Sequence, residues 1–332
     1  MKKVLSKRIS QSAAPHAFRR ALLRWYDEHG RDLPWRTTRD PYRIWVSEIM
    51  LQQTRVAAVL EHYRLFLERF PNLSALAAAS ESSVLAAWSG LGYYRRARML
   101  HQCAQRVVQE FGGRFPQSSE ALQTLPGIGR YTAAAIASIV FNELVAVVDG
   151  NVERVLQRMT GAQLTSAETW NRAEKFLSRS RPGDFNQAMM ELGATVCTPR
   201  QPSCGACPVR KWCVTQGEEV RSKNALSRHV KKEIWCALER RDGHVRLVRR
   251  SVNDSLMAGM WELPQLSKVS GAADEPDYWR TFRHSITATD YTVHVTRRAA
   301  PGVKGKWVAI EGIPDIPITG LTRKILKASG II

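Results

Sequence analysis

The chain has 332 residues, with 49 Lys and Arg against 30 Asp and Glu, so its formal net charge is +19. This length predicts about two domains, each large enough for a core of its own. The charge favours a polyanionic partner such as nucleic acid, with a merely solvated basic surface as the alternative. No stretch approaches the roughly 20 apolar residues that span a bilayer. The basic start MKKVLSKRIS leads into no apolar run, so we expect neither a signal peptide nor a membrane partner.

Residues 1–24 carry seven Lys or Arg and no acid, which predicts either a frayed tail or an arm facing nucleic acid. A helical pattern begins near Ala17 and is followed by a loop at 31–36, RDLPWR. Asp40-Pro41 then predicts the start of a second helix, because aspartate caps a helix and proline fits its first turn.

That second helix, YRIWVSEIMLQQTRV, contains an acid on an apolar stripe. Glu48 shares a helical face with Ile44, Trp45 and Leu51. A buried carboxyl there would have a raised pKa, as a proton donor needs. A partly exposed glutamate at the edge of the stripe is the alternative.

A glycine-rich turn, SGLGYYRRAR at 89–98, interrupts otherwise mostly helical sequence. It combines two tyrosines with three arginines, a set suited to base stacking and to wedging into a base stack. A packed turn on a basic surface is the alternative interpretation.

The stretch 125–155, LPGIGRYTAAAIASIVFNELVAVVDGNVERV, begins with a turn in which Gly127 and Gly129 permit angles and close approaches that a Cβ would forbid. A helix follows from about Thr132 to Phe141. Such a turn leaves backbone N–H groups free for a phosphate, although an ordinary helix–helix turn fits as well. Asp149 then stands where another helix begins, and a plain N-cap is its simplest interpretation.

Four of the six cysteines crowd into 197–213 with the spacing C-x6-C-x2-C-x5-C. This crowding indicates a metal site in a reducing compartment and argues against a disulfide framework. Four thiolates can hold a [4Fe–4S] cluster or zinc, and structural zinc sites usually use two short pairs, which this spacing lacks. The four positions are Cys197, Cys204, Cys207 and Cys213. We expect Cys103 and Cys236 to be small buried side chains.

Beyond a polar, basic segment that reads as a linker, the hydrophobic period changes. Strands are predicted at 234–239 and 244–249, joined by a turn at 241–243, and again at 291–297 and 307–310. A helix is predicted at 321–328. This region predicts a small α+β domain.

Together, LPGIGRYTAAAI, VVDGN and the cysteine spacing resemble the helix-hairpin-helix DNA glycosylases related to endonuclease III. Bifunctional members carry a lysine just after the hairpin as a Schiff-base nucleophile. Tyr131 occupies that position here and cannot form an imine, which implies a monofunctional enzyme. The segments YRIWVSEIMLQQT, GLGYYRRAR, FNQAMMELGATVC, MAGMWELP and FRH resemble the adenine DNA glycosylase (MutY) family, so the resemblance covers nearly the whole chain.

The resemblance implies removal of adenine opposite 8-oxoguanine or guanine in double-stranded DNA, in base excision repair. Glu48 would protonate the adenine ring and Asp149 would stabilise the oxocarbenium-like sugar, as in a retaining glycosidase. Tyr131 and Asn151 would support that pair, and the base would be extrahelical.

The resemblance also implies the other contacts to DNA and the cofactor. The hairpin glycines Gly127 and Gly129 would grip the DNA backbone. The adenine pocket would comprise Arg31, Leu33, Trp35, Arg36 and Gln187. Gln53 and Tyr93 would wedge into the stack, while Thr54 and Leu91 would face 8-oxoguanine. The cysteines would bind a [4Fe–4S] cluster that leaves no coordination site open for water.

The expected fold is mostly α. A helix-hairpin-helix glycosylase domain at 1–215, with the cluster loop at 197–213, precedes a linker at 216–232 and a Nudix-like α+β lesion-recognition domain at 233–332. No Nudix box follows Gly259, which argues against Nudix hydrolysis. The family's lesion loop places a residue and then Phe-Ser-His after Phe-Arg-His. Here Ile286-Thr287-Ala288 stands in that place, so only the hydroxyl of Thr287 is kept and a narrower preference for 8-oxoguanine is expected.

Two other functions stay open. One is a thymine glycosylase acting on T·G mispairs, since some such enzymes also carry tyrosine after the hairpin. The other is a non-catalytic DNA-binding protein that keeps the cluster. The C-terminal region argues against the first, and the joint presence of Glu48, Tyr131, Asp149 and Asn151 argues against the second. We expect a monomeric protein of the cytoplasm, associated with the nucleoid.

Overall fold

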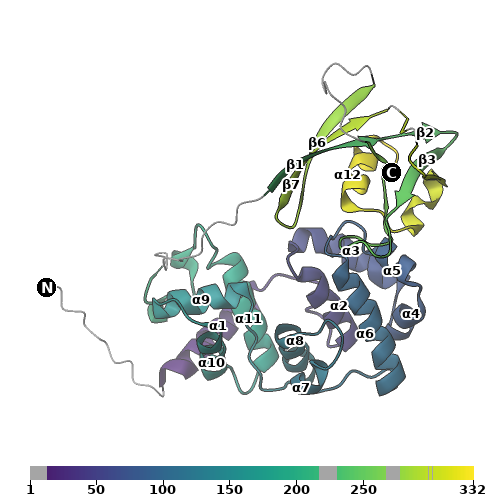
Figure 1. Cartoon of the computed structure of the whole chain (residues 1–332). Helices are drawn as coiled ribbons and strands as arrows, with labels where there is room; N and C mark the ends of the chain where they lie inside the picture. The colour runs from purple at the N-terminus through teal and green to yellow at the C-terminus, as the bar shows by residue number, and fades with distance from the viewer. Residues whose placement is uncertain (1–12, 217–229, 267–276, 298, 301) are drawn as a thin grey trace. The chain divides into compact units, whose positions relative to one another are not determined.

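Two separate stretches of the chain, Met1–Gln52 and Arg106–Lys223, form the first of two units in the computed structural model (Figure 1). The second unit contains Gln53–Gln105 and Asn224–Ile332. The structure describes residues 13–216, 230–266, 277–297, 299–300 and 302–332. The predicted basic tail up to residue 12 and most of the predicted linker, 217–229, lie outside the described residues. The domain boundaries at 215 and 233 therefore stay a prediction. Across the described ranges, no helix combines the length and apolarity that crossing a membrane would require.

The described part of the first unit is helical, apart from its connecting loops. Its helices are α1 (Ala13–His29), α2 (Pro41–Leu51), the end of α6 (Arg95–Phe111), α7 (Ser119–Leu122), α8 (Arg130–Phe141), α9 (Gly150–Thr160), α10 (Ser166–Phe176) and α11 (Pro182–Thr195), with 3-10 turns η1 (Cys204–Ala206) and η2 (Arg210–Trp212). The hairpin is formed by α7 and α8.

Local sequence sets where these helices begin and end. Asp40 caps α2 by accepting from the N–H of Tyr42, with Pro41 in the first turn as predicted. Thr165 and Glu168 form a capping box at the start of α10. Gly161 ends α9 in the left-handed conformation, with φ of 70°.

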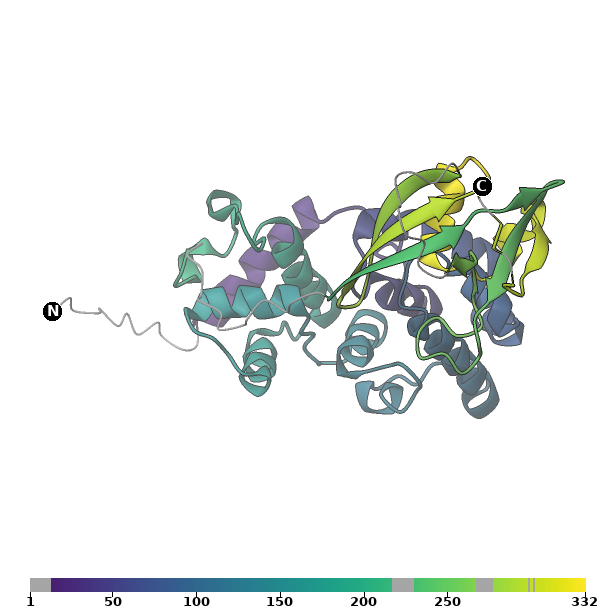
Figure 2. The ribbon, with the colours of Figure 1, turned by 45° about the horizontal axis from the view of Figure 1, so that its top comes forward.

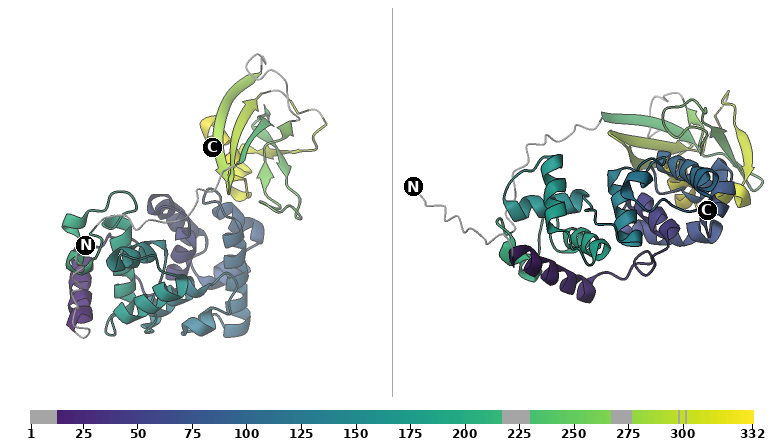
Figure 3. Two further views of the ribbon diagram at one scale, coloured as in Figure 1. Left: turned by 60° about the vertical axis from the view of Figure 1, so that its left-hand side comes forward. Right: turned by 90° about the horizontal axis from the view of Figure 1, so that it is seen from below.

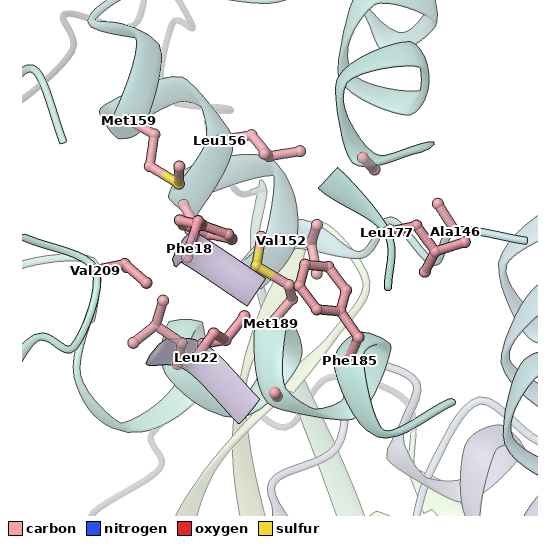
Figure 4. Close-up of a cluster of buried hydrophobic side chains, with 14 of the residues drawn as sticks. Phe18, Leu22, Ala146, Val152, Leu156, Met159, Leu177, Phe185, Met189 and Val209 are labelled. Carbon is pink, nitrogen blue, oxygen red and sulfur yellow. The ribbon is translucent and has the colours of Figure 1, made fainter. Parts of the chain in front are cut away.

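The main core of the first unit lies between α1, α9, α10 and α11, and Figure 4 shows its side chains converging. Phe18 of α1 is its centre: its ring lies 4.8 Å from that of Phe176 and 5.6 Å from that of Trp212, in the cysteine-rich loop. Both views of Figure 3 show α1 (purple) beside the teal helices it packs against. This packing connects the N-terminal helix to the cysteine-rich loop, although about 200 residues separate them in sequence.

A smaller cluster joins α2 to α8. Ile44 of α2 packs with Ala134, Ala135 and Ile139 of α8 and with Val147, just before α9. The alanines of α8 let the two helices approach closely, so residues on their facing surfaces can meet.

The second unit combines helices with two small sheets. Its helices are α3 (Val56–Arg69), α4 (Leu73–Ala78), α5 (Glu81–Ala87), most of α6, and α12 (Gly320–Ala328), with a 3-10 turn η3 (Ile310–Asp315). Its strands are β1 (Val230–Ala237), β2 (Arg240–Arg241), β3 (His244–Arg249), β4 (Trp261–Glu262), β5 (Gln265–Leu266), β6 (Tyr278–Ile286), β7 (Thr289–Thr296) and β8 (Lys306–Ala309).

One sheet has the order β5-β1-β7-β6, with β1 parallel to β7 and the others antiparallel. In the other sheet β3 pairs with β2, β4 and β8. Figure 2 shows the long strands β1, β6 and β7 side by side. Side chains of both sheets share a core with Ile325 and Leu326 of α12. The α+β character expected from the sequence is confirmed.

Two expectations for this region need correction. The predicted strands around 234–239 and 244–249 lie in different sheets, because the turn at Asp242-Gly243 joins the short β2 to β3. No strand was predicted over 278–286, but the segment holding Phe282 and His284 is strand β6, and the expected loop at Thr287 is the turn of the β6–β7 hairpin. Cross-strand pairing with β7 outweighs the weak local strand pattern of YWRTFRHSI.

Within the second unit, the C-terminal region holds the turn at 89–94 by hydrogen bonds. The carbonyl of Ile318 accepts from the hydroxyls of Ser89 at 2.9 Å and Tyr94 at 3.2 Å. Arg323 of α12 donates to the Ser89 hydroxyl at 3.0 Å. The glycine-rich turn therefore keeps a defined conformation.

Candidate functional site

The site begins with a carboxyl buried on α2. Glu48 is 6% exposed, which confirms that this carboxyl is buried and excludes the partly exposed glutamate that was the alternative. Tyr131, in the first turn of α8, donates a hydrogen bond of 2.6 Å to Oε2 of Glu48, and its hydroxyl also lies 3.4 Å from Sδ of Met190. Burial raises the pKa of Glu48 to about 7, with a further upward contribution from the charge of Asp149 and opposing contributions from Tyr131 and Arg36.

The second carboxylate is the N-cap of α9. Oδ1 of Asp149 accepts from the N–H groups of Asn151 at 2.9 Å and Val152 at 2.8 Å. Oδ2 accepts from the side-chain amide of Asn151 at 2.9 Å. The simple interpretation as a helix cap is therefore confirmed. These hydrogen bonds hold both carboxylate oxygens of Asp149 in place at the start of the helix.

The two carboxyl groups thus occupy contrasting environments. Glu48 is desolvated, whereas Asp149 is half-buried and accepts three hydrogen bonds. Such a pair can supply one proton donor and one fixed negative charge near neutral pH. Burial also raises the pKa of Tyr131 well above its ordinary value, reinforced by the charges of Glu48 and Asp149, so this phenol stays protonated and donates.

The hairpin turn uses its two glycines differently. Gly127 has φ of 73°, which L side chains rarely adopt, so glycine is needed there as predicted. Gly129 has φ of −85°, and an added Cβ would meet nothing within 4 Å. The expectation that the backbone angles at this position need glycine is wrong for Gly129, and the expected close approach of a phosphate stays a prediction. The free space leaves the backbone of the α8 N-terminus open to approach.

One helix, α11, connects the parts of the site. Asn186 donates to the carbonyl of Val145 at 2.9 Å and accepts from the N–H of Val147 at 3.1 Å, which holds the segment leading to Asp149. A Cβ on Gly193 would lie 2.6 Å from Cβ of Asn151, so α11 and α9 meet at this glycine. The predicted pocket residue Gln187 is 8% exposed on the same helix.

The other predicted pocket residues lie in the loop between α1 and α2. Leu33 and Trp35 are buried, at 5% and 6% exposure. Arg31 and Arg36 both bind Glu191 of α11, at 2.7 and 2.6 Å. These ion pairs hold the loop against α11, the helix that also carries Gln187.

The predicted wedge residues and the residues expected to face the opposite base all belong to the second unit. Gln53 and Tyr93 are exposed and have left-handed backbones, with φ of 56° and 49°. Such strain in non-glycine residues clusters at functional sites. Thr54 accepts from Arg96 at 3.3 Å, whereas Leu91 is buried, at 6% exposure. Tyr93 is therefore the side chain that this turn presents to solvent.

Thr287 lies at the tip of the β6–β7 hairpin. Its φ is 51°, and its hydroxyl donates to the neighbouring carbonyl of Ile286 at 2.7 Å. Two side chains of β7, Tyr291 and His294, are candidates to replace the missing aromatic and imidazole groups. Tyr291 pairs with His284, near the tip. His294 pairs with Thr281 farther along the strands and shares a hydrogen bond of 3.0 Å with that threonine. Tyr291 is the better placed of the two.

The four clustered cysteines line one cavity, together with Arg158, Val196, Pro202, Arg210 and Gln216. Among the described residues, no three His, Cys, Asp or Glu side chains are arranged to hold a single metal ion. Four thiolates on one zinc would lie about 4 Å apart. In a [4Fe–4S] cluster each thiolate binds a different iron at a corner of the cluster, so the sulfurs are more widely spaced. The four thiol groups around one cavity are the ligands that a [4Fe–4S] cluster needs. Cys103 and Cys236 are buried, as expected.

Two arginines of α9 hold this loop, and sequence reasoning missed both. Arg158, 5% exposed, donates to the carbonyls of Thr198 at 2.7 Å and Pro199 at 2.8 Å. Arg154 donates to the carbonyl of Cys197 at 2.8 Å and to Oδ1 of Asn151 at 2.8 Å. A hydrogen-bonded path therefore runs from the loop to the partner of Asp149. The available signal was a pair of arginines four positions apart on α9, which places both on one face of the helix.

Glu191 and Asn186 were also missed. Both lie in FNQAMMELG, where a polar residue interrupts an apolar helical face, the same signal that drew attention to Glu48.

Comparison with known proteins agrees with this architecture. Residues 46–179 match the model of the HhH-GPD superfamily base excision DNA repair proteins, and residues 197–213 match the iron–sulfur binding domain of endonuclease III. These two matches assign residues 46–179 to the fold of that superfamily, and the cofactor of the loop at 197–213 is a [4Fe–4S] cluster.

Relatives define the family more closely. The chain is 51% identical over 220 residues to the adenine DNA glycosylase of Mus musculus, covering 62% of this chain and 43% of the mouse protein. It is 35% identical over 237 residues to the adenine DNA glycosylase of Buchnera aphidicola subsp. Schizaphis graminum, covering 69% and 67%. A solved thermostable thymine-DNA glycosylase superposes with a TM-score of 0.57 and 32% identity, over 61% of this chain and 96% of that one. The chain belongs to the adenine DNA glycosylase family. It spans less than half the length of the mouse relative.

Proposed function

We propose that the protein is a monofunctional DNA glycosylase that removes adenine mispaired with 8-oxoguanine or guanine by hydrolysing the N-glycosidic bond. The observation that carries the proposal is the pairing of two carboxyl groups in opposite environments. Glu48 is buried and accepts a hydrogen bond from Tyr131. Asp149 caps α9 and accepts hydrogen bonds from backbone and side-chain amide N–H groups.

Glu48 is the proton donor in this mechanism. With a pKa of about 7, a large fraction of the carboxyl is protonated at neutral pH, whereas an ordinary glutamate would be almost fully ionised. Proton transfer to the adenine ring makes the base a neutral leaving group. Tyr131 orients the carboxyl through its hydrogen bond.

Asp149 stabilises the positive charge that develops on the sugar, and the mechanism continues through a covalent glycosyl intermediate that water hydrolyses with retention. Asn151 fixes the carboxylate that faces the sugar. Tyr131, as a phenol, offers no amine for an imine, so the enzyme stops at base removal.

The remaining predicted contacts divide between the units. In the first unit, the loop 31–36 and Gln187 form the adenine pocket, while Gly127 and Gly129 admit the DNA backbone to the α8 N-terminus. In the second unit, Gln53 and Tyr93 wedge into the stack, and Thr54, Leu91 and the hairpin tip at Thr287 face the opposing base. The C-terminal α+β region is Nudix-like in this proposal and reads the lesion. The partner is a double-stranded DNA with an A·8-oxoguanine or A·G mispair, and the protein acts as a monomer at the nucleoid.

Cys197, Cys204, Cys207 and Cys213 would hold the [4Fe–4S] cluster. With all four positions occupied by thiolates, the cluster gives the loop its shape and leaves the hydrolysis to the carboxyl pair. Arg154 and Arg158 hold the same loop from α9 through its carbonyls.

The likeness to a thymine-DNA glycosylase favours a second candidate, excision of thymine. That structure matches 61% of this chain, so the rest of the chain has no counterpart in it. The four site residues together argue against a non-catalytic binder.

A panel of duplexes containing A·8-oxoguanine, A·G, T·G or C·8-oxoguanine tests the proposal directly. We expect base release from the first two alone, followed by strand breakage only after alkali. Release from T·G would establish the second candidate, and binding without release from any duplex would establish the non-catalytic one.

A further inference from the structure

A single buried carboxylate holds both arginines of the loop between α1 and α2. The side chain of Glu191 has no exposed surface. Arg31 binds it twice, through Nε at 2.7 Å and Nη2 at 2.7 Å, and its backbone N–H adds a contact of 3.1 Å. Arg36 adds a fourth hydrogen bond of 2.6 Å. Although burial alone would raise the pKa of Glu191, these partners lower it to about 2, so the group is ionised.

These contacts connect the two ends of the loop. Nη1 of Arg36 also donates to the carbonyl of Arg31 at 3.0 Å, and its guanidinium lies 5.3 Å from the ring centre of Tyr26. The loop between these anchors contains the buried Leu33 and Trp35. An ion-pair network of this kind fixes the two ends of the loop through one desolvated carboxylate.

We infer that Glu191 is a positioning residue that fixes the 31–36 loop as a wall of the base pocket and offsets one of the two positive charges of Arg31 and Arg36, so that the pocket attracts anions less and receives an uncharged base. This inference rests on the proposed function. It assigns no chemical step to Glu191, which acts only through Arg31 and Arg36.

The charge of Arg36 also acts on the proton donor Glu48. The charged or titratable groups that act on Glu48 are Tyr131, Asp149 and Arg36. In the native arrangement the charge of Arg36 is offset by Glu191. Loss of the carboxylate would leave that positive charge uncompensated and would favour ionised Glu48, so the proton donor would titrate at lower pH.

The test compares Glu191→Gln with Glu239→Gln as a matched control. Glu239 is 9% exposed, and it accepts from Arg246 at 3.1 Å and from the N–H of Ala300 at 3.0 Å, in the C-terminal region. Both variants remove one buried carboxylate charge. Single-turnover excision of adenine from A·8-oxoguanine is measured from pH 5 to 9, alongside thermal unfolding.

For Glu191→Gln we expect a rate about 10- to 100-fold below that of the control, as displaced binding groups typically cause. The alkaline limb of its pH profile should also move to lower pH. A rate and a profile equal to those of Glu239→Gln would overturn the inference. If wild type released no adenine at all, the proposed function would fail instead.

Because unpairing a buried ion pair is strongly destabilising, Glu191→Gln could be recovered unfolded. In that case Glu191→Asp is used as the test variant, since aspartate keeps the carboxylate charge but has a side chain shorter by one methylene group. We expect a reduced rate with the alkaline limb at its wild-type pH. An unchanged rate would count against positioning by this side chain.

Inhibition by inorganic phosphate tests whether removal of the Glu191 carboxylate frees the guanidinium groups of Arg31 and Arg36. At constant ionic strength, phosphate should inhibit Glu191→Gln several-fold more than wild type or Glu239→Gln, because two free guanidinium groups bind phosphate. Equal inhibition of all three proteins would contradict the role of Glu191 in offsetting the charge of Arg31 and Arg36.

Discussion

The phenol of Tyr131 and the carboxyl of Glu48 meet across the α2–α8 contact, with 2.6 Å between the hydroxyl and Oε2. Burial, the strongest influence, and the charge of Asp149 raise the pKa of Glu48, whereas this hydrogen bond lowers it, and the resulting pKa is about 7. The packing of α2 against α8 therefore influences whether Glu48 is protonated.

The first prediction is a pH profile. Glu48 donates a proton, so the excision rate should be highest at acidic to neutral pH and fall about tenfold per pH unit above roughly 7, as the donor deprotonates. Glu48→Gln should be inactive at every pH. Single-turnover rates between pH 5 and 9 measure this. A profile that is flat into the alkaline range would rule out a protonated Glu48 as the donor.

The second prediction separates capping from catalysis at Asp149. Asp149→Asn should abolish excision but keep duplex binding, because asparagine caps a helix about as well as aspartate and differs mainly in charge. Asp40→Asn is the matched control, since Asp40 caps α2 in the same way. We expect full excision by the control. Comparable activity in the two variants would return Asp149 to the role of a plain cap.

The third prediction concerns the residue after the hairpin. Wild type should form no adduct that borohydride can trap, because it has a phenol at this position. Tyr131→Lys should form one, together with some strand cleavage, since the new amine can form an imine. Gel mobility after borohydride treatment shows the adduct. Trapping of wild type would show that the enzyme is not monofunctional.

The fourth prediction concerns the cluster loop. Cys204→Ser should lower the iron and sulfide content, the soluble yield and the affinity for duplex DNA, because the loop that carries Arg200 depends on the cluster for its shape. Cys103→Ser is the control, as this buried thiol lies outside the loop. Iron and sulfide analysis of purified wild type comes first. Zinc in place of iron would refute the cluster assignment.

The fifth prediction concerns the β6–β7 hairpin. Wild type should excise adenine opposite both 8-oxoguanine and guanine, with a narrow preference, because Ile286 and Ala288 replace the aromatic and imidazole groups of the family pattern. Ile286→Phe with Ala288→His should widen that preference, since a stacked ring contributes about 1–3 kcal/mol. Single-turnover rates and duplex affinities measure it. If neither quantity changes in the double variant, the hairpin does not read the lesion, and Tyr291 becomes the next residue to test.

Local patterns predicted much of the helical frame. Asp40-Pro41 marked the start of α2, the apolar run after Gly129 marked α8, and the spacing of four cysteines marked the cofactor loop. Each of these signals acts within a few residues, through capping, periodicity or ligand spacing. The strands were harder to predict: β6 was missed, because its stability comes from pairing with β7 and not from its own residues.

By itself, then, the sequence determined the helices, the cysteine set and the identity of the candidate carboxyl groups. Tertiary structure alone decided which of two interpretations held for Glu48, because burial depends on the helix that packs against its face. It also decided that Gly129 has no conformational need for glycine, and that Glu191 binds both Arg31 and Arg36. These properties arise from groups about 80 to 160 residues apart, and charge, desolvation and hydrogen bonding act through space, where sequence separation carries no information.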